Sequence, residues 1–258
     1  MVEQKVPQFT EMRFLKNEIL RNLRDFPRDV VNILTANYSD GVIAGLDLTV
    51  TDEVIRISPG IVKNQERLLL LGERMEIPYQ ENGKKQILKL VFEEPYKEAD
   101  FSGQKAGISL SDNIEPQKAE MELARFQLEK GAYLRSEYQD LLDFSTGYNT
   151  LNLVYQPYSS IGETTIHPRI LQYFARELLS YRIENPQDTT ICFQILNQSY
   201  SISKEVLGAY FQMRLQEEVT VTDNVGIHEK LVQILEKAKR EKRQVLKSHT
   251  GNRKLIVD

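Results

Sequence analysis

Hydrophobic and polar residues alternate along residues 41–79, and this alternation predicts short strands. Leu46, Leu48 and Val50 are separated by polar residues, which places the three apolar side chains on one face of an extended strand. The same alternation resumes at residues 55–57, after a short polar break. We therefore expect these two runs to pair as an antiparallel hairpin.

Turn-forming residues divide this stretch further. Ser58-Pro59-Gly60 predicts a type II turn, because proline fixes φ at the second position and glycine accepts a positive φ at the third. Residues 64–66 predict a looser turn, and the continuous apolar run of residues 68–71 predicts a strand buried on both faces. Asn82-Gly83 predicts one more hairpin, since both residues tolerate left-handed backbone.

Two further strands are predicted on the same grounds. Residues 86–93 alternate, and residues 121–129 fit a strand that Gly131 ends. Residues 97–116, in contrast, are rich in Glu, Asp, Ser, Gly and Lys and predict a surface excursion.

The N-terminal segment has helical spacing instead. Thr10 is suited to cap a helix, and the apolar residues that follow form one stripe, made of Met12, Leu15, Ile19, Leu23 and Phe26. We expect Pro27 to end this helix and residues 29–36 to continue as a shorter one. The stripe has two interpretations: it packs on the sheet of its own chain, or Met12, Leu15 and Ile19 contact a neighbouring subunit.

Tyrosines are frequent between residues 133 and 158, where polar residues interleave with them. A tyrosine buries its ring and keeps one hydrogen-bonding tip, which suits the seam between two domains. Tyr148, Tyr155 and Tyr158 are accordingly candidates for a protein interface. A carbohydrate-binding surface is the alternative interpretation of the same region.

The spacing becomes helical again from residue 165. Helices are predicted from Pro168, after Ser201 or Ser203, and after Thr222 or Asp223, with a short strand at residues 189–196 between the first two. The fold class is therefore α+β. An N-terminal helix plus an antiparallel β-rich domain occupies residues 1–156, and a mainly helical domain follows in residues 163–258.

Composition agrees with a globular protein and limits the partners and compartments that we expect for it. The chain has 258 residues, of which 41% are hydrophobic and 27% charged, and a formal net charge of -4. A mildly acidic chain is not expected to coat nucleic acid over its whole surface. Cys192 is the one cysteine, so no internal disulfide forms, and no apolar run is long enough to span a bilayer. We expect folding in the cytoplasm.

The sequence carries no motif of a known catalytic site. It lacks the P-loop, GxGxxG and GxSxG patterns. His167, His228 and His249 are far apart and do not have the spacing of a zinc site. Cys192 lies in an apolar run, which favours a buried, inert thiol over a nucleophile paired with His167. We expect no enzymatic activity, no cofactor and no metal.

One basic cluster lies near the C-terminus and includes Lys239, Arg240, Lys242 and Arg243. Such a run can bind phosphate, so a nucleic-acid-binding accessory protein is an alternative function. Acidic residues interrupt the cluster, and cations at this end of a helix also complement its dipole. The pattern favours a solvated helix end.

Three segments of the strand region resemble proteins associated with the tails and baseplates of phages and prophages. They are GVIAGLDL at residues 41–48, IRISPGIV at residues 55–62 and the leucine run at residues 67–71. A fourth segment, at residues 122–129, resembles a strand that follows in such proteins. The resemblance covers about half of the chain. It implies a structural component of a tail or baseplate that contacts other tail proteins, with homo-oligomers among the expected assemblies, and that ends up in a tail particle.

Overall fold

The computed structural model describes residues 5–12, 14–51, 53–181, 185–198 and 200–251, with side chains given up to residue 242. Contacts divide the chain into two units, residues 1–38 and residues 39–258. Each unit is described by itself. The predicted division at residues 156–163 falls inside the second unit.

The first unit contains helix α1 (Asn17–Leu34). The helix begins later than predicted, because Met12 has a left-handed φ of 62° and Lys16 is extended, so Met12 and Leu15 precede the helix. Pro27 does not end it, which corrects a second expectation. Proline removes only its own N–H and the one bond that it would donate, and α1 continues for a further seven residues.

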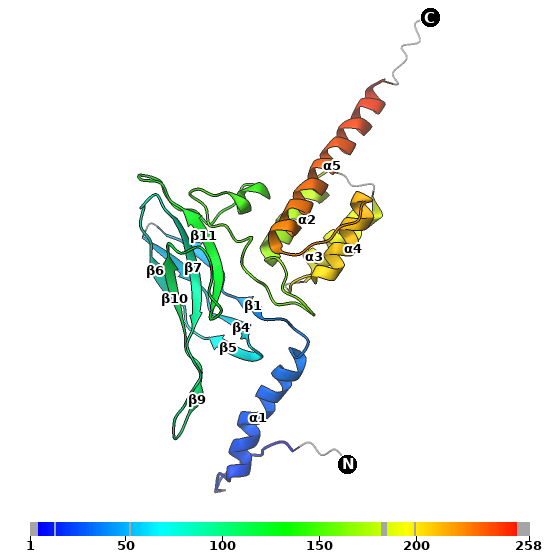
Figure 1. Ribbon diagram of the computed structural model, residues 1–258. Coiled ribbons are helices and arrows are strands. Elements are labelled where there is room, and N and C mark those ends of the chain that lie inside the picture. Colours follow the sequence, from blue (N-terminus) through cyan, green and yellow to red (C-terminus); the bar gives the residue numbers. More distant parts are fainter. Residues whose placement is uncertain (1–4, 13, 52, 182–184, 199, 252–258) are drawn as a thin grey trace, which may run out of the picture. The chain divides into compact units, whose positions relative to one another are not determined.

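The second unit is α+β, with antiparallel sheets followed by helices (Figure 1). One sheet has the order β1-β4-β5, a second β10-β7-β11 and a third β2-β3-β6, and β8 pairs with β9. The strands are β1 (Gly41–Gly45), β2 (Leu48–Val50), β3 (Val54–Ile57), β4 (Gly60–Asn64), β5 (Arg67–Leu71), β6 (Met75–Pro78), β7 (Lys85–Phe92), β8 (Tyr96–Lys97), β9 (Ser102–Gly103), β10 (Ala106–Ser111) and β11 (Glu120–Gln127).

Several predicted strand features are confirmed. β2 and β3 form the expected antiparallel pair, with Leu48 opposite Ile57. The turn predicted at residues 64–66 is present, but it is tight and not loose: Asn64 pairs with Arg67, and Gln65 and Glu66 between them have φ values of 48° and 65°. β11 is the strand expected near residues 121–129.

The predicted type II turn at Ser58-Pro59-Gly60 is wrong. Gly60 lacks the positive φ that this turn requires, and β3 and β4 pair with different neighbours. The chain passes here from the β2-β3-β6 sheet to the β1-β4-β5 sheet. Glycine is needed for close approach instead: a Cβ on Gly60 would lie 2.7 Å from the carbonyl oxygen of Ala44 and from the backbone nitrogen of Leu46.

Three other strand expectations need correction. β5 is not buried on both faces, because it is the edge strand of its sheet and Leu70 is 75% exposed. Asn82-Gly83 joins β6 and β7, which do not pair with each other, so this turn is no hairpin. Residues 97–116 are only partly a surface excursion, since alternating Ile108 and Leu110 place β10 in register with β7.

Four helices follow the strands in the second unit, after a 3-10 turn at Leu142–Ser145. They are α2 (Pro168–Leu179), α3 (Pro186–Asn197), α4 (Lys204–Leu215) and α5 (Asn224–Gly251). The strand predicted at residues 189–196 is wrong, because Asn185 caps α3 by accepting from the backbone N–H of Gln187 and Pro186 occupies its first turn. No described helix is both long and apolar enough to cross a bilayer.

One hydrophobic core runs through the second unit, from the strands into the helices. It includes Leu123 and Phe126 from β11, Phe174 from α2 and Leu231 from α5. The tyrosine-rich region contributes to the same core, because Tyr138 stacks on Phe144 with ring centroids 3.7 Å apart. This region therefore packs against both strands and helices within one core.

Candidate functional site

His167 illustrates how the chain uses its few chemically active side chains. It is buried at the start of α2, where Nδ1 accepts a hydrogen bond from the backbone N–H of Arg169 at 3.0 Å. The other ring nitrogen, Nε2, therefore carries the proton and lies 3.4 Å from the hydroxyl of Tyr158. That hydroxyl lies 3.3 Å from the carbonyl oxygen of Gly45. The histidine thus connects α2 to β1 and has no free nitrogen for acid–base work.

Burial explains the electrostatics of this histidine and of Cys192. Desolvation, with a smaller effect of the Arg169 charge, lowers the pKa of His167 to about 3, so the ring is neutral at physiological pH. Desolvation likewise raises the pKa of the Cys192 thiol to about 12, which keeps it protonated. The two groups lack the properties of a general base and a thiolate nucleophile.

A buried ionic network ties the helices of the second unit together. Asp188 on α3 is fully buried and accepts from the Tyr210 hydroxyl at 2.8 Å and from Nε of Arg214 at 3.0 Å. The guanidinium of Arg214 also donates to both carboxylate oxygens of Glu241, at 3.0 and 2.6 Å. Each charged group has a partner of opposite charge, and the network joins α3, α4 and α5. Its side chains therefore have a structural role.

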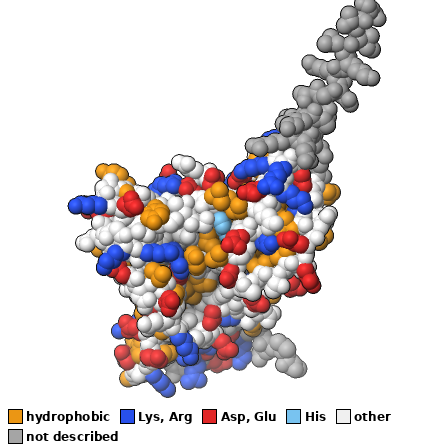
Figure 2. All heavy atoms as spheres, turned by 45° about the horizontal axis from the view of Figure 1, so that its top comes forward, with side chains coloured by type: hydrophobic (Ala, Val, Ile, Leu, Met, Phe, Trp, Pro, Cys, Tyr) orange, Lys and Arg blue, Asp and Glu red, His pale blue; other side chains and the backbone are white. Residues whose placement is uncertain are grey.

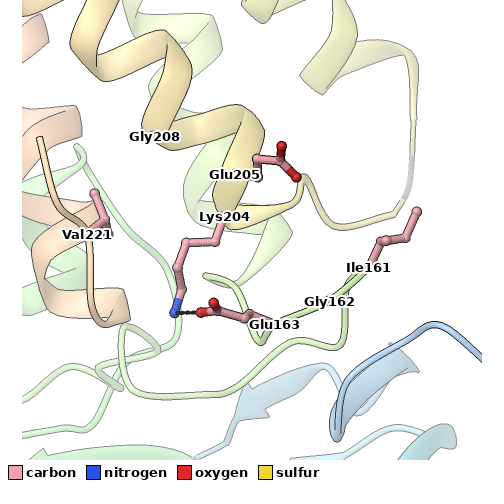
Figure 3. Close-up of a pocket in the computed structure, with 7 residues that line it drawn as sticks. All are labelled: Ile161, Gly162, Glu163, Lys204, Glu205, Gly208 and Val221. Carbon is pink, nitrogen blue, oxygen red and sulfur yellow. Dashed lines mark hydrogen bonds and ion pairs between the residues drawn. The ribbon is translucent and has the colours of Figure 1, made fainter.

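The hollow drawn in Figure 3 lies between the loop at residues 161–163 and the start of α4. Its volume is about 280 Å³. Figure 3 shows the Glu163 carboxylate facing the Lys204 ammonium, 2.8 Å away, while the Glu205 carboxylate points away from this pair. Lys204 donates in addition to the carbonyl oxygen of Thr222 at 3.1 Å. The hollow therefore holds one satisfied ion pair that fixes the loop to α4.

Metal ligands do not gather anywhere in the part of the chain that the structure describes: it holds no group of three His, Cys, Asp or Glu side chains able to bind an ion. On the face shown in Figure 2, acidic and basic side chains are interspersed.

The three tyrosines predicted for an interface have different surroundings. Tyr148 is 52% exposed, whereas Tyr158 is buried and bonded as described above. Tyr155 is partly exposed, and the guanidinium carbon of Arg125 lies 3.3 Å from the centroid of its ring. Arg125 also forms a bidentate ion pair with Glu122, which fixes the position of its guanidinium over the ring. Tyr148 is the member of the three that is most available for an external contact.

The basic cluster on α5 is engaged by neighbouring groups. Lys239 forms an ion pair with Glu177 at 3.1 Å, and Lys242 donates to the carbonyl oxygen of Ser180 at 3.3 Å. Arg240 lies 3.6 Å from Glu236, one turn earlier on the same helix. The side chain of Arg243 lies outside the described residues. These local partners fit the solvated helix end that the sequence favoured.

Exposed apolar side chains are the feature that these contacts leave unexplained. In the second unit Phe193 and Leu196, on one side of α3, are 61% and 38% exposed and line an open hollow of about 550 Å³. The incorrect strand prediction at residues 189–196 concealed this face. Phe193 and Leu196 are three residues apart, so in a helix they lie on the same face.

A second such surface belongs to α1, in the first unit. None of its residues is buried. Seven of its large apolar side chains are between 39% and 75% exposed, namely Leu20, Leu23, Phe26, Val30, Val31, Ile33 and Leu34. Ile19 is half-buried on the same helix, whereas Met12 and Leu15 are exposed in the segment before it. The apolar surface thus extends further along the chain than predicted, because the helix continues through Pro27.

Comparison with known proteins gives only distant matches. The sequence matches no protein-family model and no curated protein. Similar solved structures include a chain of the type VI secretion system TssK-TssF-TssG baseplate subcomplex, determined by cryo-electron microscopy. It is 11% identical with a TM-score of 0.38, and the alignment covers 91% of this chain and 99% of that one. A crystal structure of TssK is 10% identical with a TM-score of 0.35, over 93% of this chain and 69% of that one. At such TM-scores these matches identify neither the fold nor the function.

Proposed function

We propose that this protein is a non-enzymatic structural component of a phage or prophage tail or baseplate and acts through contacts with other tail proteins. It is made in the bacterial cytoplasm and is carried in the tail particle. The observation that carries the proposal is the strand-and-turn pattern of residues 41–71, which resembles that of tail and baseplate-associated proteins.

The backbone packing around this pattern shows that its glycines are required by the fold. A Cβ on Gly45, at φ 72°, would lie 2.1 Å from the carbonyl oxygen of Pro59. On Gly41, at φ 138°, it would lie 2.8 Å from the carbonyl oxygen of Pro157. Together with Gly60, these glycines stand where two backbone segments meet too closely for any side chain. The spacing of the pattern therefore corresponds to a particular arrangement of strands.

The distribution of reactive and apolar groups supports a function through contacts. Buried His167 and Cys192 have pKa values that hold them uncharged, and the described cations of α5 have local partners. Exposed apolar residues, in contrast, gather on α1 and on α3. Surfaces of this kind typically bind other proteins.

Deleting the gene in the source organism tests the proposal. Particles are induced and purified from the deletion strain, from the parent and from the deletion strain complemented with the wild-type chain. We expect fewer complete tails or baseplates in the deletion strain by electron microscopy, with recovery on complementation. Normal numbers of complete particles in the deletion strain would argue against a structural role.

A further inference from the structure

Strand β5 has one edge without a neighbouring strand. It is the outer strand of the sheet β1-β4-β5, and among the described residues no segment other than β4 forms backbone hydrogen bonds with it. The described residues of the first unit form no strand, and a helix such as α1 keeps its backbone groups bonded to each other. The N–H and C=O groups on the outer edge of β5 are therefore suited to an extended segment from another molecule.

The hairpin turn decides which residues of β5 face this edge. A two-residue turn closes on a hydrogen-bonded pair, here Asn64 and Arg67. Because bonding alternates along an antiparallel pair, every second residue from Arg67 bonds to β4. Leu68 and Leu70 therefore direct their N–H and C=O groups outward, as Gly72 does when the strand extends by one residue.

The side chains of this edge are apolar and lack the protection that edge strands normally have. Leu70 is 75% exposed, and Leu68 is partly exposed. Proteins usually protect an edge strand with a lysine, a proline or a bulge. Residues 68–71 are all leucine, and their register with β4 is regular. An edge of this kind is a site for the addition of a strand.

The charges that flank the leucine run indicate which strand is added. The sequence reads Glu66-Arg67, then five uncharged residues, then Glu73-Arg74. Two copies that pair in antiparallel fashion about Leu70 place Arg67 of one copy opposite Glu73 of the other. The same register places Glu66 opposite Arg74, so each charge faces an opposite charge. All four charged side chains are exposed, and none has an ion-pair partner among the described residues.

The backbone and the core fit the same register. It places Leu70 opposite Leu70 and Leu68 opposite Gly72, so the outward N–H and C=O groups meet in hydrogen-bonded pairs. A shift by one residue would set outward groups against inward ones and would also separate the opposite charges. On the other face, Leu69 of one copy meets Leu71 of the second. Both leucines are only partly buried against the core of their own chain, and the pairing extends that core.

We propose that β5 is a dimerisation strand, at which two copies of this chain pair antiparallel about Leu70. The pairing joins two three-stranded sheets into one sheet of six strands. It is isologous, since the same surface is used on both copies, and therefore closes at two protomers. This inference is independent of the proposed function.

Reversal of single charges tests the register. Arg67→Glu sets two carboxylates opposite each other, and Glu73→Arg sets two cations opposite each other. Sedimentation velocity of the full chain is expected to give two protomers for the wild type and for Lys97→Glu, which reverses an exposed cation on β8. Each of the two β5 variants is expected to dimerise at least about tenfold more weakly, because like charges meet twice in each dimer.

Mixing the two β5 variants gives the sharper result. A pair made of one Arg67→Glu chain and one Glu73→Arg chain has opposite charges at both contacts, and so does the double variant that carries both changes. We expect the equimolar mixture and the double variant to dimerise as the wild type does. A structural role of either residue within one chain would not produce this rescue. Circular dichroism checks that all variants are folded.

Cross-linking tests the position of the two-fold axis. The Cα atoms of a hydrogen-bonded antiparallel pair are about 5.5 Å apart, which a disulfide can span. The native Cys192 is buried, so a new cysteine is the one that reacts. Leu70→Cys is expected to form disulfide-linked dimers more than about tenfold faster than Phe101→Cys, a control whose native side chain is similarly exposed, at 71%.

Several results would overturn the inference. They are a wild-type monomer at high micromolar concentration, a trimer, a dimer that the single charge reversals leave intact, or no rescue in the mixture. Equal cross-linking at residues 70 and 101 would overturn it as well, as would assembly that appears only with another protein. None of these results bears on whether the chain is found in tail particles.

Discussion

Lowering the pH should destabilise this protein through His167. In the folded state Nδ1 accepts from the N–H of Arg169, so a proton cannot be added there without breaking the cap of α2. Burial, together with the Arg169 charge, lowers the pKa of His167 from 6.5 to about 3. Because the folded pKa lies below the unfolded one, the stabilisation is complete above pH 6.5. It is lost as the pH falls toward 3.

The size of the effect follows from these two pKa values. At pH 5 the unfolded chain binds nearly one proton at this site and the folded chain almost none, which costs about 2 kcal/mol of unfolding free energy relative to pH 7.5. Burial also lowers the pKa of His228, so the wild type loses more than His167 alone explains. His167→Asn isolates the contribution, because asparagine keeps an N-cap acceptor but does not titrate.

Urea unfolding followed by circular dichroism at both pH values measures the effect. The asparagine variant loses the contact with Tyr158 and starts from lower stability, so the comparison uses the change with pH and not the stability itself. We expect the variant to lose about 2 kcal/mol less than the wild type between pH 7.5 and 5. Equal losses in the two proteins would refute the link between the buried cap and acid sensitivity.

Three further predictions concern stability and are checked by urea unfolding. Arg214→Met leaves the Asp188 carboxylate buried without its cation and should cost about 3–5 kcal/mol, while adding Asp188→Leu should restore most of it; an unrestored double variant would contradict the ionic account. Gly45→Ala should prevent stable folding, since its Cβ would meet the Pro59 oxygen, whereas Gly72→Ala, with open space around it, should change little. Leu48→Ala should cost about 2–5 kcal/mol because Leu48 is in the core, and Leu70→Ala, at 75% exposure, about 0.5 kcal/mol or less; similar costs would show that Leu48 is misplaced.

The sequence predicts the strands well where alternation and turns agree. Leu48 and Val50 pair with β3 as expected, and Met75 and Ile77 alternate on β6 with exposed neighbours. The pattern does not show which strands become neighbours. Ser58 and Pro59 were interpreted as a reversal, yet they carry the chain from one sheet to another, because pairing depends on contacts distant in the sequence.

The two helix errors share a physical origin. Residues 189–196 were interpreted as a strand, although Pro186, directly after Asn185, starts a helix that includes them, since proline is well suited to a first turn. Pro27 was interpreted as the end of a helix, although α1 continues through it. A proline alone does not distinguish these cases. The Asn185 cap was the local signal that could have corrected the first.

The candidate surfaces could be predicted only in part. The sequence contains the apolar stripe of α1, but the stripe was ended at Pro27, and the local pattern does not show that Phe26 and Val30 are exposed. Tyr155 and Tyr158 look alike in sequence, whereas one lies against Arg125 and the other is buried beside His167. Such differences arise from tertiary packing, which the local pattern does not contain.

The copy number of this protein in purified tail particles tests the central claim most directly. Particles from induced cells are separated on a density gradient, and each fraction is quantified by mass spectrometry against labelled standards for this chain and for the major tail proteins. A structural component should sediment with the particles at one fixed ratio to those proteins in every particle fraction. Its absence from the particle fractions, or a ratio that varies freely between them, would contradict the account.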